Sequence, residues 1–408
     1  MSNPIIIVGA GPVGLTLALL LHEAGKEVQI YESVTALRPL GVGINLLPHS
    51  VRVLHQLKLE SKLDEIAIRT SNLQYYNKLG QLIWSEPRGL DAGYQFPQYS
   101  IHRGYFQQML LQEVQQRLGS ESVKTAHKLV RWEDSADGVD AVFLSDGKEE
   151  VVKGSCLIAA DGINSSARTL LYPDEGDAIY GGRILWRGTS HAEPFLDGRT
   201  MFMAGHQDCK FVAYPIGRPT EGEQLINWIA ELSVPDLEPD VQDWNRAVSP
   251  DKFSSHFESW KFDWLSIPDL IDNCNQVFEF PLSDRDPLPR WTHGNMTLIG
   301  DAAHPMYPIG SNGASQGILD AEALVNELNN QPSITDAFKQ YESIRRPATA
   351  KIVLLNRQNG PEQVMQLAEE RAPNGFEDIE TVIPRAELEE IAARYKQTAG
   401  FTVEAVNK

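Results

Sequence analysis

The chain has 408 residues, of which 42% are hydrophobic, and a formal net charge of −19. This length is sufficient for two or three packed units, each with its own core. The excess of acidic residues repels phosphate groups, so neither nucleic acid nor an anionic membrane surface is expected as a partner.

The cysteines and the N-terminal residues indicate a cytoplasmic protein. Cys156, Cys209 and Cys274 are far apart and lack the spacing of a disulfide framework or a zinc site. The apolar residues 5–21 are interrupted by glycines and follow no basic segment, unlike a signal peptide or a membrane helix. We expect a soluble protein without a metal site, either a monomer or a homodimer.

The first elements predict a βαβ unit. Residues 5–8 form a short apolar run typical of a buried parallel strand, and residues 13–24 have a helical pattern after a glycine turn. Residues 28–32 match a second strand. Farther along, residues 72–86 predict a hairpin and residues 105–118 a helix.

Strand patterns dominate the middle of the chain. Residues 123–133 and 139–152 alternate like antiparallel strands, the second range around an Asp-Gly turn. Residues 156–162 predict another buried strand, and the aromatic-rich residues 180–232 predict an antiparallel sheet. Residues 236–275 are expected to be helical and irregular.

The last third returns to a parallel strand and then to helices. Residues 296–300 have the buried-strand pattern, and the chain is predicted to be helical after Pro332, with a break at Pro347. Roughly the last 45 residues are polar, and a partly ordered helical tail is expected there.

These elements predict an α/β fold, α+β overall. It combines a Rossmann-like βαβ nucleotide-binding domain with an antiparallel-sheet domain and C-terminal helices. The nucleotide-binding domain is discontinuous, covering residues 1–72, 99–175 and 284–345. The sheet domain covers residues 73–98 and 176–283, and residues 346–408 form the C-terminal helical segment.

The stretch "VGAGPVG" carries the strongest motif. Gly9, Gly11 and Gly14 form a dinucleotide-binding fingerprint between a strand and a helix. Gly9 permits a tight turn, Gly11 lets a pyrophosphate approach the backbone, and Gly14 lets the helix pack on the strand. Glu32, at the end of the second strand, suits a free ribose hydroxyl, which favours FAD or NAD over NADP.

Two further strand ends are candidates for the same ligand. In "AADGINSSAR", Asp161 and Gly162 end a strand, although a plain Asp-Gly turn explains them equally well. In "LIGDAAHPMYPIGSNGASQ", Asp301 could accept hydrogen bonds from a polyol chain. Residues 310–313 begin a helix whose free N–H groups suit negative charge, and an ordinary capped helix is the alternative.

Three basic residues are ambiguous. His304 is a candidate base, but a structural histidine is the favoured interpretation. Arg38 and Arg103 could contact phosphate, although solvated arginines are the simpler interpretation.

Together, the three motifs resemble those of the class A flavoprotein monooxygenases of the p-hydroxybenzoate hydroxylase fold. The resemblance covers residues 4 to 355. The stretches "RPLGVGIN", "WSEPRG", "PQYSIHRG", "DRDPLPRW" and "GDAAHPMYPIGSNGASQ" also resemble those of phenazine hydroxylases.

The resemblance implies FAD as cofactor, NADH or NADPH as a transient reductant, and O2. At the adenosine and pyrophosphate, the implied FAD contacts are Glu32 at the ribose, Leu129 at adenine, and Gly9, Ala10, Gly11, Pro12, Val13 and Gly14 at the pyrophosphate. Arg103 would lie near the phosphates and ribityl chain, Asp301 at the ribityl chain, and Asp161 and Gly162 in a groove shared with the nicotinamide donor. The implied contacts of the isoalloxazine are Arg38, Gly41 and Gly43 beside it, and Pro308, Gly310, Asn312 and Gly313 along its pyrimidine edge.

The resemblance also implies an activity that needs no catalytic side chain. NAD(P)H reduces FAD, O2 adds at flavin C4a, and the hydroperoxide hydroxylates a small aromatic or N-heteroaromatic substrate. A single fingerprint fits this class, because the nicotinamide donor then has no domain of its own. Two alternatives remain: a flavin oxidoreductase of the same fold without oxygen insertion, and a flavin-binding protein without turnover.

The substrate would lie between the flavin and the antiparallel sheet. Trp186, Met203, Tyr214 and Phe280 are candidate wall residues, and Arg187 is a candidate partner for an acidic group. For each of these wall residues, an ordinary place in the sheet core is the favoured interpretation.

Overall fold

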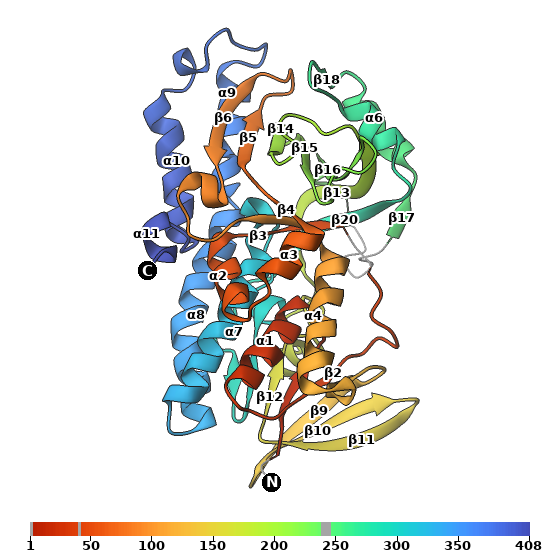
Figure 1. The fold of residues 1–408 in the computed structure, drawn as a ribbon, viewed down its shortest axis with the longest axis vertical. Coiled ribbons are helices and arrows are strands. Elements are labelled where there is room, and N and C mark those ends of the chain that lie inside the picture. Colours follow the sequence, from red (N-terminus) through yellow and green to blue (C-terminus); the bar gives the residue numbers. More distant parts are fainter. Residues whose placement is uncertain (1–2, 40–41, 238–245) are drawn as a thin grey trace.

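The apolar runs predicted as parallel strands meet in a six-stranded sheet (Figure 1). The computed structural model describes residues 3–39, 42–237 and 246–408. The strand order is β21-β22-β12-β1-β2-β8, and every pairing is parallel except that of β21 with β22. The strands are β1 Ile5–Val8, β2 Val28–Tyr31, β8 Val123–Lys124, β12 Cys156–Ala159, β21 Thr292–His293 and β22 Met296–Leu298.

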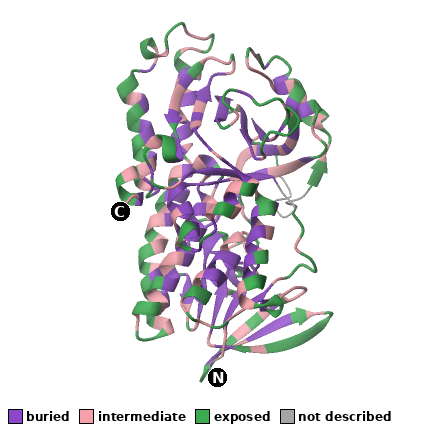
Figure 2. Ribbon diagram, in the orientation of Figure 1, coloured by how far each residue is buried: buried purple, intermediate pink, exposed green. Residues whose placement is uncertain are grey.

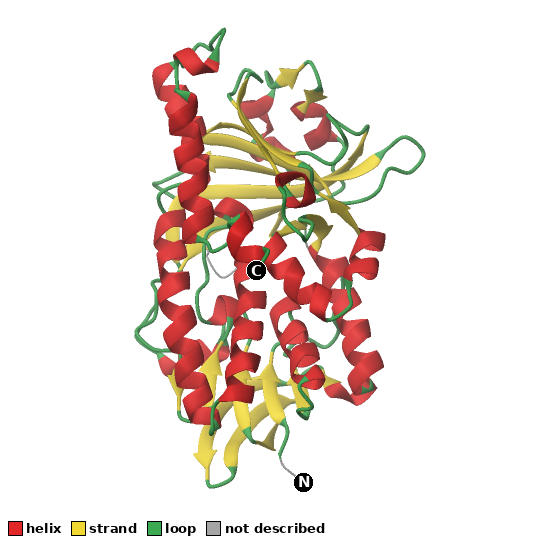
Figure 3. Cartoon of the chain, turned by 60° about the vertical axis from the view of Figure 1, so that its left-hand side comes forward, coloured by secondary structure: helices red, strands yellow, loops and turns green. Residues whose placement is uncertain are grey.

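Helices pack along this sheet (Figure 3). Helix α1 lies against α4 and α7, and α7 lies against α8. The α1–α7 contact is close, because a Cβ on Gly317 would lie 2.5 Å from a methyl group of Val13. The helices of this part are α1 Pro12–Glu23, α2 Pro48–Gln56, α3 Glu60–Ile66, α4 Arg103–Leu118, α5 Ser166–Leu171, α7 Gly313–Asn330 and α8 Ile334–Asn356, with short 3-10 turns η2 Ser120–Ser122, η5 Gly300–Ala302 and η6 Ile309–Ser311.

One predicted strand divides into two. Residues 123–133 contain β8, which joins the parallel sheet, and the start of β9 Lys128–Ser135. The chain turns between them at Ala126, whose φ is +57°. β9 pairs with β10 Gly138–Ser145, which pairs with β11 Lys148–Gly154, and this hairpin sheet projects at the bottom of Figure 1.

An eight-stranded sheet lies in the upper half of the molecule in Figure 1, beside α6, α9 and α10. Its order is β17-β20-β13-β16-β15-β14-β5-β6, and only β14 and β5 pair in parallel. This confirms the predicted hairpin and antiparallel sheet. The strands are β5 Asn72–Tyr76, β6 Leu82–Pro87, β13 Ile179–Ala192, β14 Met201–His206, β15 Cys209–Pro215, β16 Gln224–Ser233, β17 Arg246–Val248 and β20 Val277–Asp284.

Smaller elements complete this half. The three-stranded sheet β3-β7-β4 lies between the two large sheets, in the middle of Figure 1. Of the segment 236–275, residues 238–245 are outside the described part. The rest contains short helices, as predicted, and also three short strands, β17, β18 and β19, which were not predicted. The elements are β3 Gly43–Leu46, β4 Ala67–Arg69, β7 Tyr99–His102, η1 Gly89–Ala92, η3 Pro250–Lys252, η4 Ser254–Phe257, β18 Lys261–Phe262, β19 Leu265–Ser266 and α6 Ile267–Asp272.

The C-terminal segment differs from the prediction in two ways. Pro347 does not break α8, because the buried Tyr341 and Ile352 anchor the helix on both sides of it. The polar tail is also not loose, since Leu388 and Phe401 are buried in the core. Its elements are η7 Gly360–Glu362, α9 Gln363–Arg371, η8 Ile379–Thr381, α10 Arg385–Thr398 and α11 Val403–Val406.

Burial follows the sheets. In Figure 2 the buried residues concentrate in the strands of both large sheets and on the inner faces of the helices. Among the described residues, no helix is both long and apolar enough to cross a membrane.

The buried C-terminal segment leads to a first prediction. Phe401 is 2% exposed, and its ring stacks on His49 of α2 at 5.5 Å. Phe401→Ala should therefore lower the free energy of unfolding of the FAD-saturated protein by about 3 to 5 kcal/mol. Leu354→Ala, at a position 50% exposed, should change it by less than about 0.5 kcal/mol. Equal urea midpoints for the two variants would contradict this packing.

Candidate functional site

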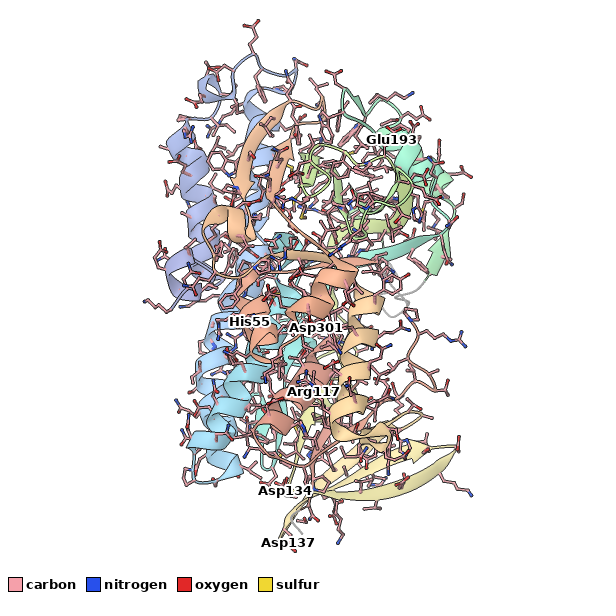
Figure 4. The ribbon with its side chains drawn as sticks, in the orientation of Figure 1. His55, Arg117, Asp134, Asp137, Glu193 and Asp301 are labelled. Atoms are coloured by element: carbon pink, nitrogen blue, oxygen red, sulfur yellow. The ribbon has the colours of Figure 1, made fainter. Side chains whose placement is uncertain are left out.

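The parallel pairing brings four predicted residues to one edge of the sheet. Gly9, Glu32 and Asp161 follow β1, β2 and β12, and Asp301 lies in the turn after β22. Carboxyl ends of neighbouring parallel strands share an edge, which is where open α/β sheets bind ligands. Figure 4 labels Asp301 near the middle of the molecule, between the two halves.

The three fingerprint glycines have different surroundings. A Cβ on Gly9 would lie 2.5 Å from the Ala160 carbonyl oxygen, and one on Gly14 would lie 2.1 Å from the Gly9 carbonyl oxygen. Both positions therefore require glycine for close packing. A Cβ on Gly11 would have no atom within 4 Å, so this glycine leaves open space where a ligand can approach the backbone.

The neighbouring motif residues serve α1 itself. Pro12 is the first residue of the helix, and Val13 packs against the turn at Gly300. The Ala10 N–H donates to Glu32 Oε2 at 2.8 Å. Glu32 Oε1 also accepts from the Val34 N–H at 3.0 Å, so the carboxylate is held at the end of β2.

A first cavity of about 570 Å³ opens at this edge. This volume is far more than a single bound water needs. Gln107, which sequence reasoning missed, also borders the cavity and donates to the Ala10 carbonyl at 2.8 Å. The predicted residues that line it are Gly9, Gly11, Glu32, Arg38, Arg103, Leu129, Asp161 and Gly162.

Asp161 has an unsatisfied carboxylate oxygen in this cavity. Its Oδ2 accepts from the Ala167 N–H at 3.3 Å, whereas its buried Oδ1 has no hydrogen-bond partner. Burial raises the pKa of the carboxyl above its ordinary value. A ligand that donates a hydrogen bond would satisfy the free oxygen.

A second cavity, of about 200 Å³, lies between the turn after β22 and the eight-stranded sheet. Asp301 borders this cavity, and its side chain is exposed to it. The surrounding protein withdraws the carboxyl from bulk water, and this desolvation raises its pKa. Gly41 is outside the described residues. The predicted residues that line this cavity are Gly43, Arg187, Met203, Tyr214, Asp301, Pro308, Asn312 and Gly313.

The N-terminus of α7 points its free N–H groups toward this cavity. Asn312 is the N-cap residue, but its side chain forms no capping hydrogen bond, and the first turn contains no acidic residue. Gly313 and Ala314 both line the cavity. An uncapped helix N-terminus favours a ligand with negative charge. Gly310 lies against Tyr395, whose hydroxyl would be 1.9 Å from a Cβ there.

The candidate substrate residues do not all face the second cavity. Arg187 faces the second cavity, whereas the adjacent Trp186 faces the other side of the sheet, where its ring stacks on Phe253 at 4.8 Å. Successive residues of a strand point to opposite faces, so the two cannot share a wall. Phe280 packs beside Arg187, with 5.6 Å between its ring centroid and the guanidinium carbon. Arg38 lines the first cavity rather than the second.

His304 has the surroundings of a structural histidine. It is 3% exposed, and its Nε2 lies 2.5 Å from Asp320 Oδ2. Asp320 also accepts from the Gly300 N–H and pairs with Arg345. This network holds the turn that carries Asp301 and keeps His304 away from the second cavity.

The fold and these two cavities define a flavoprotein with one dinucleotide-binding unit. The open backbone at Gly11, the free oxygen of Asp161 and the uncapped α7 all fit FAD. The chain belongs to the family of proteins with this FAD-binding domain, whose model matches residues 2–355.

Relatives agree with this assignment. The chain is 42% identical over 366 residues to the phenazine 1,6-dicarboxylic acid hydroxylase PhzS of Lysobacter antibioticus, covering 87% of this chain and 89% of that protein. It is 30% identical over 366 residues to the 3-amino-4-hydroxybenzoate 2-monooxygenase PtnB3 of Streptomyces platensis, covering 88% of each. The structure of HpxO of Klebsiella pneumoniae with FAD and uric acid shares the fold, with a TM-score of 0.72, 21% identity, and coverage of 99% of this chain and 95% of that one.

The protein is a FAD-dependent monooxygenase of the aromatic hydroxylase type. NAD(P)H and O2 as co-substrates are consistent with these relatives, which are named hydroxylases or monooxygenases. The names favour the predicted hydroxylase over an oxidoreductase without oxygen insertion and over a protein without turnover.

The fingerprint geometry gives a sharp test. The backbone of Gly11 has φ −71° and ψ 173°, which any residue can adopt. Gly11→Val should therefore keep the thermal midpoint of the FAD-free protein but abolish FAD binding. Gly14→Val should lower that midpoint, because its side chain meets backbone. Gly11→Val protein that still purifies with a full complement of FAD would contradict the assignment.

Proposed function

We propose that FAD extends through both cavities and that the substrate is a planar aromatic carboxylate of the phenazine type. The first cavity would hold the adenosine and pyrophosphate, with Gly11 at the phosphates, Glu32 at the ribose and Leu129 at adenine. Asp301 would bind the ribityl chain. Residues 308–313 would border the pyrimidine edge, and the substrate would lie against the sheet of residues 73–98 and 176–283.

The observation that carries the substrate class is the partly buried charge of Arg187. This side chain lines the second cavity, and among the described residues it forms no ion pair with a carboxylate. Its Nε is buried without a hydrogen-bond partner, while one terminal nitrogen donates to the Gly43 carbonyl at 3.3 Å. A charge that is partly withdrawn from water and has no counter-ion is costly, so an anionic ligand would stabilise it.

The electrostatics of Arg187 support the same conclusion. Burial lowers the pKa of the guanidinium below its ordinary value, and the nearby charge of Arg103 acts in the same direction. Tyr214 opposes this shift only in part. A carboxylate could form two parallel hydrogen bonds with the guanidinium and would remove the penalty.

The names of the two relatives also favour a carboxylate. One is named for a phenazine dicarboxylic acid and the other for a substituted benzoate. At 42% identity, the phenazine hydroxylase is the nearer of these two. The middle of the cavity is apolar, with Leu185, Val212 and Ile229 on its walls, which suits the faces of a flat ring system.

The protein's part in the reaction is binding and orientation. When bound, FAD takes electrons from NAD(P)H and activates O2, so no side chain has to attack the ring. The N-terminus of α7 would stabilise the negative charge on the pyrimidine edge. Arg187 would fix the substrate by its carboxylate, so that one ring carbon faces the flavin.

The ribityl role of Asp301 can be tested by FAD affinity. Asp301→Ala should raise the Kd for FAD about 10- to 100-fold, because one or two hydrogen bonds to a charged acceptor are lost. Asp137→Ala, on the exposed hairpin between β9 and β10, is the control and should leave the Kd unchanged. Equal affinities for the two variants would contradict the assignment.

The role of Arg187 predicts a selective loss. Arg187→Met should raise the KM for phenazine-1-carboxylic acid about 10- to 100-fold and should affect phenazine-1-carboxamide much less. Arg187→Lys should recover part of the loss. The assay is NAD(P)H oxidation, with product identified by mass spectrometry under ¹⁸O-labelled O2. Equal losses for acid and amide would remove the argument for a carboxylate.

A further inference from the structure

A cluster of buried charges lies on the second cavity, apart from Arg187. Lys210, Glu231 and Glu362 line the cavity and are 3%, 4% and 6% exposed. The Lys210 ammonium lies 3.0 Å from Glu231 Oε2 and 2.5 Å from Glu362 Oε2. Arg183 binds the other oxygen of Glu231 at 3.1 Å. The proposed function does not involve this cluster.

The strand register locates the cluster within the cavity. Tyr214, Val212 and Lys210 point to the same face of β15, and Lys210 pairs with Glu231 of β16. Four residues of antiparallel strand span about 14 Å. Tyr214 is at the Gly43 end, because a Cβ on Gly43 would lie 2.6 Å from its ring. Lys210 is therefore at the opposite end, and the apolar Val212 lies between them.

The charges of the cluster cancel. Arg183 and Lys210 contribute two positive charges, and Glu231 and Glu362 contribute two negative charges. Burial alone would lower the pKa of the Lys210 ammonium, but the two carboxylates outweigh it and raise that pKa. Lys210 therefore remains charged and has one N–H donor beyond the two directed at the carboxylates.

We propose that Lys210, Glu231 and Glu362 form a second subsite that binds an uncharged, hydrogen-bonding substituent of the substrate. The inference rests on the proposed function, in which Arg187 binds one carboxylate. A hydroxyl or a carboxamide can accept a hydrogen bond from Lys210 and donate one to Glu231 or Glu362. The preferred substrate is thus a monocarboxylate with a neutral polar group at its far end.

A second carboxylate does not suit this subsite. It could accept from Lys210, but it has no proton to donate, and it would lie beside two like charges. In a site withdrawn from water, such repulsion is only weakly screened. The neutral cluster thus predicts selection against dicarboxylates, whereas Arg187 alone would not distinguish them from monocarboxylates.

Three phenazines test the proposal by difference titration of the flavin spectrum of the FAD-loaded enzyme. They are phenazine-1-carboxylic acid, phenazine-1,6-dicarboxylic acid and the monoamide of that diacid. The wild-type enzyme should bind the monoamide at least tenfold more tightly than the diacid. Equal or tighter binding of the diacid would overturn the subsite. Binding of the monocarboxylic acid reports separately on the proposed function, and if none of the three binds, both proposals fail.

Two variants change the charge of the cluster in opposite directions. Glu362→Gln gives it a net positive charge and should reduce the preference for the monoamide at least tenfold by strengthening diacid binding. Lys210→Met removes the donor and should weaken monoamide binding at least tenfold. Glu369→Gln removes a carboxylate from the Lys78 ion pair on α9 and should leave the preference unchanged.

The FAD content and the thermal midpoint of each variant show whether that variant is folded. The Glu362→Gln prediction is a gain of diacid affinity, which a misfolded protein would not produce. The proposal would be overturned if the ratio of monoamide to diacid affinity were the same in the wild-type enzyme, Glu362→Gln and Glu369→Gln.

Discussion

The parallel pairing of β1, β2, β12 and β22 is the constraint on which the rest of the structure depends. It brings the carboxyl ends of these strands to one edge, so residues distant in sequence, such as Asp161 and Asp301, follow neighbouring strands. The pairing needs close contact between α1 and the sheet, which Gly9 and Gly14 permit because a side chain at either position would meet backbone. The cofactor site is thus a consequence of how the core packs.

The eight-stranded sheet supplies the other wall, and strand alternation decides what that wall contains. One face of β13 presents Leu185 and Arg187 to the cavity, while the other face places Trp186 in an aromatic core. The result is an apolar middle, with the guanidinium of Arg187 near Gly43 at one end and the neutral charge cluster at the other. A cavity of this kind selects for a flat ring system and for the charge of its substituents.

The C-terminal segment closes the site from a third side. The ring of Tyr395 of α10 packs against Gly310. The Tyr395 hydroxyl donates to the Ile309 carbonyl at 3.2 Å. Glu362 reaches Lys210 in the sheet. Glu362 and Tyr395 lie beyond residues 2–355, which the family model matches, so this wall of the cavity comes from outside the matched residues.

The sequence by itself determined the fold class, the fingerprint turn and the strand ends at Asp161 and Asp301, because these depend on local periodicity and on glycine positions. Only the tertiary structure decided that Arg187 rather than Trp186 faces the cavity, since alternation predicts that neighbours point apart but not which one points inward. It also decided that the few apolar residues of the polar C-terminal tail, such as Leu388 and Phe401, are buried and that Glu362 meets Lys210. Such contacts join residues far apart in the chain and leave no trace in the local pattern around either one.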